Sequence, residues 1–129
     1  MTSKYEQLSH IRKQLQQDGL APDWYSTASY QLLSNKHYLD TAETPKDMYT
    51  RIAKRASELT YFDVPKDYGY ENWFDAYYDL LWKGWLSPST PVLTNMGNNR
   101  GHPIACSGTH VGDSIRSFGL ARREIEQLT

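Results

Sequence analysis

Residues 87–106 read SPSTPVLTNMGNNRGHPIAC, and the rest of the chain is organised around this stretch. It contains three prolines and a run rich in Gly and Asn, at Pro88, Pro91, Pro103 and 97–101. Because proline lacks a backbone donor and Gly and Asn favour turns, this composition predicts a loop and not a helix. We expect the loop to lead into one short strand at 104–110 and to present the Thr90 hydroxyl and the Cys106 thiol.

Upstream of this loop, four segments repeat apolar side chains at the spacing of a helix face. The first begins with the capping box Ser3–Glu6 and ends at Asp18-Gly19, and the second opens at Asp23 and ends at Ser34-Asn35. The apolar positions are Tyr5, Leu8, Ile11 and Leu15, then Trp24, Ala28 and Leu32, then Met48, Ile52, Ala56 and Leu59, and finally Trp73, Phe74, Tyr77, Leu80 and Leu81. Four helices are therefore predicted, the last ending near Lys83-Gly84.

The third of these helices has the clearest start signal. Thr44 can act as its N-cap, Pro45 suits the first helical position, and Asp47 is favourable in the first turn. Its basic side chains point away from the apolar stripe, and they are Arg51, Lys54 and Arg55. They could clamp a phosphate, but a solvated helix face is the commoner meaning of such a pattern.

Downstream of the loop, Asp113-Ser114 can cap a fifth helix. Its apolar side is formed by Ile115, Phe118, Ala121, Ile125 and Leu128. The strand expected at 104–110 has no second strand in the sequence to pair with, and a lone strand leaves its backbone groups unsatisfied. The fold class is therefore mainly α, with about five helices and one short strand. A helical domain at 1–86 would precede the incomplete start of something larger at 87–129.

Charge and hydropathy exclude several classes of protein. The 129 residues include 14 basic and 15 acidic side chains, and a net charge of -1 gives no footprint for nucleic acid or an anionic membrane. No apolar run approaches the roughly 18 residues of a membrane span, and the N-terminus lacks the apolar core of a signal peptide. We therefore expect a cytoplasmic protein.

Metal ligands are scarce. One cysteine cannot form an internal disulfide, and four scattered histidines do not complete a zinc site around it. An acidic row on the fourth predicted helix lacks an interleaved His and is more typical of an exposed stripe, at Glu71, Asp75 and Asp79. We expect no metal and no cofactor in this chain, and a lone cysteine is by itself most often incidental.

Two runs of the sequence, taken in order, indicate a family. The first is Ser-Pro-Ser-Thr-Pro at 87–91, a Gly/Asn turn, Cys106 sixteen positions after Thr90, and Gly-Asp-Ser-Ile at 112–115. The second is Lys36-His37-Tyr38-Leu39 followed by Glu43-Thr44-Pro45. Over residues 28–115 the chain thus resembles the large subunit of class I ribonucleotide reductases. The resemblance implies the amino-terminal helical region of a ten-stranded α/β barrel enzyme, with 87–129 as the start of the catalytic barrel.

The resemblance also implies roles for three residues in the reduction of a ribonucleoside diphosphate. Cys106 would be one of two thiols that reduce the ribose, ending in a disulfide with a cysteine outside this chain that thioredoxin or glutaredoxin then reduces. Thr90 would hold the substrate diphosphate, although it could instead only stabilise the turn. Ala105 stands where many relatives have Ser, so it would contact substrate through its backbone alone.

A second ligand site is implied at Asp113, Ser114 and Ile115. They match the start of the specificity site, where a nucleoside triphosphate effector selects the substrate, although Asp113 could also be a plain N-cap. Only 35 residues precede Lys36, too few for the ATP-binding cone that many relatives carry. Control of overall activity by ATP and dATP is therefore not expected.

Two classes of function follow. The chain is a fragment or split subunit of a reductase that makes deoxyribonucleotides for DNA synthesis. In that case it is inactive alone and depends on the rest of the large subunit and on a radical from a metal-containing small subunit. Alternatively, it is a non-catalytic helical binding or assembly module derived from the reductase. In either case we expect self-association through the last strand and helix, because an unpaired edge and an uncovered apolar face favour any partner.

Overall fold

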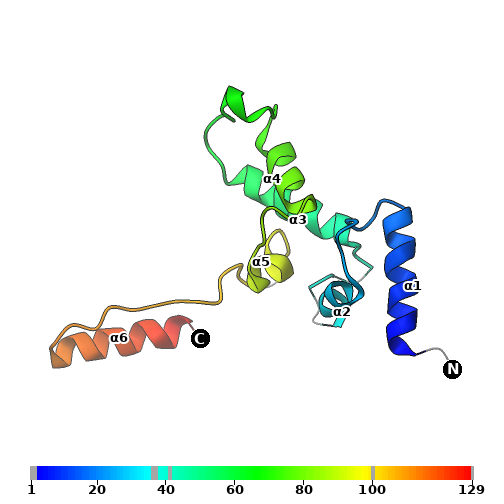
Figure 1. Ribbon diagram of the computed structural model, residues 1–129. Coiled ribbons are helices and arrows are strands. Elements are labelled where there is room, and N and C mark those ends of the chain that lie inside the picture. Colours follow the sequence, from blue (N-terminus) through cyan, green and yellow to red (C-terminus); the bar gives the residue numbers. More distant parts are fainter. Residues whose placement is uncertain (1–2, 36–37, 41, 100, 129) are drawn as a thin grey trace.

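Figure 1 shows the computed structural model of the chain, which describes residues 3–35, 38–40, 42–99 and 101–128. Within these ranges the chain is helical, and no strand is present. The elements are α1 (Lys4–Gln17), α2 (Thr27–Asn35), α3 (Pro45–Glu58), the 3-10 turn η1 (Lys66–Tyr68), α4 (Trp73–Trp82), α5 (Thr90–Asn95) and α6 (Ile115–Leu128). The prediction of a mainly α fold is confirmed. The Lys36-His37 pair of the family motif lies outside the described residues.

Two of the helices, α4 and α5, pack on α3, and α1 and α2 pack on each other. In Figure 1, α3 and α4 lie side by side, α1 packs on α2, and α5 packs against α3. α6 contacts none of the other described helices and lies at the end of a long extended segment. The folded part of the chain thus consists of the elements from α1 to α5. None of the described helices is long and apolar enough to span a bilayer.

α1 and α3 begin where their capping boxes predict. Ser3 Oγ accepts the Glu6 N–H at 3.2 Å, and the Glu6 carboxylate accepts the Ser3 N–H at 2.7 Å. Thr44 and Asp47 repeat this arrangement at 3.3 and 2.9 Å. Each box supplies partners for backbone donors that the first turn of a helix leaves free.

The pH dependence of unfolding should report the α3 cap. Hydrogen bonds from the Thr44 hydroxyl and backbone N–H lower the pKa of Asp47. Such a carboxyl stabilises the fold above its unfolded pKa of about 3.9, and this stability is lost as the pH falls through the folded pKa. We expect Asp47→Asn to flatten the pH dependence of the free energy of unfolding below about pH 4, as urea titrations can measure. Asp67→Asn, at an exposed site in η1, is the control, and equal profiles for both variants would exclude this role.

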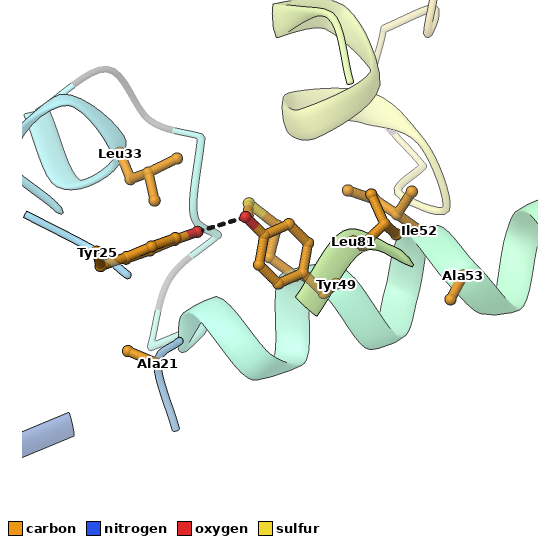
Figure 2. Packing of buried hydrophobic residues seen from close by; sticks show 8 residues of the cluster. Ala21, Tyr25, Leu33, Tyr49, Ile52, Ala53 and Leu81 are labelled. Carbon is orange, nitrogen blue, oxygen red and sulfur yellow. Dashed lines mark hydrogen bonds between the residues drawn. The ribbon is translucent and has the colours of Figure 1, made fainter. Parts of the chain in front are cut away.

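The hydrophobic core is centred on the apolar stripe of α3 (Figure 2). Its buried members are Ala21, Tyr25 and Leu33, then Met48, Tyr49, Ile52 and Ala53 of α3, and Leu81 of α4. The Tyr25 and Tyr49 hydroxyl oxygens are 2.6 Å apart, and burial raises the pKa of both side chains. The two phenols therefore stay neutral and satisfy each other's hydrogen-bonding groups inside the core.

α2 begins three residues later than the sequence pattern predicts. Ser26 Oγ accepts the Ser29 N–H at 3.0 Å and so caps the helix at Thr27. The chain before it turns instead, with the Tyr25 N–H bonded to the Pro22 carbonyl at 3.1 Å. The prediction that Asp23 opens this helix is therefore wrong.

α5 lies inside the stretch for which the sequence predicted only a loop. Ser89 stands at the N-cap, and Pro91 falls in the first turn, where its missing N–H costs no intrahelical hydrogen bond. Val92 and Leu93 then pack against the core. The prediction of a loop throughout 87–106 is wrong, because proline excludes a helix interior but not a first turn.

The strand expected at 104–110 is not present. This segment is extended and almost wholly exposed, and no neighbouring strand in the described part of the chain offers it a ladder. α6 follows with most of its apolar side exposed, including Ile115 at 89% and Phe118, while Ala121 is buried. The side chain of Leu128, which the sequence placed on the same face, lies outside what the structure describes.

Candidate functional site

Thr90 is the first residue of α5, and its side chain is exposed. Its hydroxyl lies 3.3 Å from the hydroxyl of Tyr38, whose ring packs against the core. The Thr90 carbonyl accepts the Thr94 hydroxyl at 2.8 Å, one turn further on. The structure therefore presents two adjacent hydroxyls at the start of α5, and such groups can donate to phosphate oxygens.

Arg51 of α3 fixes the other end of α5. Its guanidinium donates to the Leu93 carbonyl at 3.0 Å and to the Met96 carbonyl. It also forms a two-point ion pair with Glu43, at 2.8 and 3.1 Å. Arg51 therefore does not belong to a solvated basic face as predicted. It follows Met48 by three residues, which puts the two on neighbouring positions of one helix face, and this was the signal in the sequence that it faces inward.

The other two residues of the predicted basic face do lie on an open surface. Lys54 and Arg55 line a hollow of about 550 Å³ between α3 and the turn at 97–99. Arg55 pairs with Glu58 at 3.0 Å, and both side chains are about half exposed. Lys54 and Arg55 therefore belong to a solvated helix face, as the sequence predicted.

The turn after α5 returns the chain to that helix. Asn98 Nδ2 donates to the Thr94 carbonyl at 2.8 Å, and Asn95 Nδ2 donates to the His102 carbonyl at 2.9 Å. Beyond this point the segment with Ala105 and Cys106 is exposed, and the cysteine is a free thiol. No hydrogen bond among the described residues joins Thr90 to Cys106 or Asp113.

The predicted effector residues stand at the start of α6. Ser114 Oγ accepts the Ser117 N–H at 3.1 Å, and Ser117 Oγ accepts the Gly112 N–H at 2.6 Å. Ser114 is therefore the residue that caps α6, and Asp113 is not. The Asp113 side chain is exposed and makes no hydrogen bond to another described residue, and Ile115 is exposed beside it.

Two members of the predicted acidic row, Asp75 and Asp79, lie in α4 and make local contacts, whereas Glu71 precedes the helix. The Asp75 carboxylate accepts from Asn72 Nδ2 at 2.7 Å, and the Asp75 N–H donates to Asn72 Oδ1 at 2.9 Å. Asp79 accepts from Lys83 Nζ at 2.7 Å and from the Tyr70 hydroxyl at 2.6 Å, and these bonds lower the pKa of Asp79. Across residues 3–128, apart from the gaps given above, no three His, Cys, Asp or Glu side chains form a group that could hold a metal ion.

The fold and the contacts of α5 thus define a small helical domain that supports an exposed polar loop. A family model described as the ribonucleotide reductase all-alpha domain matches residues 24–101. Because the match covers more than half of the sequence, the chain belongs to the ribonucleotide reductase large-subunit family, in which this domain is amino-terminal. Searches of curated proteins and of solved structures found no match.

The matched range includes some of the predicted site residues and not others. It runs from Trp24, before α2, to the turn after α5, and so contains Thr90 and its neighbour Tyr38. Ala105, Cys106 and the effector residues 113–115 follow it. Membership of the family therefore rests on the helical domain, and the roles of the later residues rest on the sequence motif.

Proposed function

We propose that the chain is the amino-terminal part of a class I ribonucleoside-diphosphate reductase that makes deoxyribonucleotides for DNA synthesis in the cytoplasm. The observation that carries this proposal is the family match over 24–101, which includes Thr90 at the start of α5. The exposed Thr90 hydroxyl beside that of Tyr38 suits a substrate diphosphate. In the assembled enzyme this chain adjoins the rest of the barrel, and a metal-containing small subunit supplies the radical.

Cys106 acts as one of two reducing thiols in this proposal. A thiyl radical elsewhere in the enzyme removes the 3′ hydrogen of the ribose, and the 2′ hydroxyl leaves as water. Cys106 and a second cysteine together supply two hydrogens, one to the departing water and one to C2′, and end as a disulfide. The 3′ hydrogen then returns to the ribose, which regenerates the thiyl radical, and thioredoxin or glutaredoxin reduces the disulfide through thiol exchange. The exposure of Cys106 supports the proposal, because a thiol on an extended, open segment is accessible to a second cysteine.

Asp113, Ser114 and Ile115 contribute to the effector site in this proposal. Since Ser114 makes the capping bond of α6, the Asp113 carboxylate is left for a sugar hydroxyl of a nucleoside triphosphate. A single exposed wall cannot offset the entropy of holding a ligand, so binding requires the assembled enzyme. The backbone of Ala105 contributes beside Cys106 to the substrate site.

The second candidate function is a non-catalytic binding or assembly module. The exposed Ile115 and Phe118 side chains on the apolar side of α6 favour it, because exposed large apolar side chains suit docking or self-association. In a reductase the same face docks on further barrel elements. Complementation of activity by the remainder of a large subunit separates the two candidates, because only the reductase fragment restores turnover.

Thr90→Ala should weaken substrate binding in the assembled reductase. Loss of one hydrogen bond to a charged oxygen is expected to cost about 1–3 kcal/mol, seen as a higher KM for ribonucleoside diphosphate. Thr94→Ala is the matched control, because that hydroxyl already donates to the Thr90 carbonyl and faces the helix backbone. Equal KM values for wild type and Thr90→Ala would reject the substrate role of Thr90.

A further inference from the structure

Arg51 and Asn98 together satisfy the carbonyls at the carboxyl-terminal end of α5, and Asn98 bonds those of Thr94 and Asn95. The last carbonyls of a helix have no partner within it, and here Arg51 donates to those of Leu93 and Met96. α5 has only six residues, and its N-cap Ser89 makes no side-chain capping bond. A helix this short is not stable by itself, so it depends on contacts from outside.

Glu43 orients that arginine. The carboxylate meets Nε at 2.8 Å and Nη2 at 3.1 Å, and the side chains of Arg51 and Glu43 are only 12% and 10% exposed. A planar guanidinium can serve this carboxylate and two carbonyls at once, whereas a lysine ammonium cannot match the same fork. The ion pair thus fixes the plane from which Arg51 reaches α5.

The turn after α5 is packed directly on the same residue. Gly97 has φ +80°, and a Cβ built there would lie 2.6 Å from Arg51 Cγ and 3.0 Å from its carbonyl oxygen. At the opposite end of α5, the Thr90 hydroxyl makes one side-chain hydrogen bond within the described ranges, with the Tyr38 hydroxyl at 3.3 Å. α5 is therefore anchored firmly at 93–97 and weakly at Thr90.

We infer that Arg51, oriented by Glu43, is a positioning residue that sets where α5 presents the Thr90 hydroxyl to substrate. The inference rests on the proposed substrate role of Thr90. Arg51 does not touch the substrate, and it acts by holding the helix and the following turn on α3. Replacing the Arg51 guanidinium should therefore weaken substrate binding only by displacing the Thr90 hydroxyl.

Hydrogen exchange on the full chain tests the first half of this inference. Arg51→Lys keeps the charge and removes the fork, so the amides at 92–98 should exchange at least about tenfold faster, while those of α4 stay unchanged. Arg55→Lys, one turn along α3, is the matched control, because Arg55 pairs with Glu58 and donates no hydrogen bond to α5 among the described residues. Glu43→Gln should give the same pattern with a smaller change. Unchanged exchange at 92–98, or equal acceleration throughout the chain, would overturn the inference.

A double-mutant cycle in the assembled reductase tests the second half. Arg51→Lys should raise the KM for ribonucleoside diphosphate by about tenfold with little change in kcat, and should add almost nothing in a chain that already carries Thr90→Ala. A merely structural residue would instead give independent, additive effects. If Thr90→Ala raises KM and the effect of Arg51→Lys adds to it in full, the positioning role of Arg51 is rejected and the substrate role of Thr90 stands. If Thr90→Ala itself leaves KM unchanged, the proposed substrate role fails and the inference fails with it.

Discussion

Cys106→Ser is expected to abolish multiple turnover in a reductase assembled from this chain and the remainder of the large subunit. A hydroxyl matches the thiol in shape but cannot enter a disulfide, so the enzyme would lose its reducing equivalents. Substrate and effector affinities should stay near normal, because the group is used in chemistry and not in ground-state binding. Steady-state formation of deoxyribonucleoside diphosphate, beside equilibrium binding of both nucleotides, measures the two effects.

Ser107→Ala supplies the control for this variant. It changes a neighbouring exposed side chain of the same extended segment and removes no thiol. Its turnover should equal that of the wild type. A normal steady rate for Cys106→Ser would refute the central role proposed for this chain, and the family membership would then reflect ancestry without catalysis.

Leu81→Ala should produce the largest loss of stability. Leu81 is 1% exposed and belongs to the core on α3. Truncation of a buried leucine costs about 2–5 kcal/mol, because both its transfer free energy and a cavity count against the fold. Small domains have only about 5–15 kcal/mol in total, so a chain of this size could lose most of its cooperative unfolding transition.

Urea unfolding followed by circular dichroism measures this loss. Leu59→Ala is the matched control, because Leu59 stands at the C-cap of α3, on which Leu81 packs, but is 47% exposed. Its free energy of unfolding should change far less, since exposed substitutions usually stay within about 0.5 kcal/mol. Similar losses for the two variants would show that the burial pattern around α3 is wrong.

The helix starts show how far local sequence can lead. The caps at Ser3 and Thr44 join residues three positions apart, so pattern and structure agree there. The start of α2 was missed because Ser26 competes with Asp23 for the same role, and spacing alone does not choose between them. α5 was missed because Pro91 was weighed as a helix breaker without regard to its position in the first turn.

The candidate site divides in the same way. The motif around Thr90 and Cys106 was visible in residue order and spacing, and membership of the family is confirmed over 24–101. The strand at 104–110 was wrong because a strand needs a partner, and none of the described residues provides one. The cap of α6 at Ser114 in place of Asp113 depends on side-chain geometry that residue type leaves open.

By itself, then, the sequence determined the mainly helical class, the caps of α1 and α3, the buried positions Met48 and Ile52 of α3 and the residue motif that indicates the family. Only the tertiary structure decided that Arg51 faces inward to Glu43 and α5, that Tyr25 and Tyr49 share a buried hydrogen bond, and that Tyr38 stands beside Thr90. The physical reason is distance along the chain. Periodicity and capping follow from interactions within one or two helical turns, whereas these contacts join residues that only the packing of separate helices brings together.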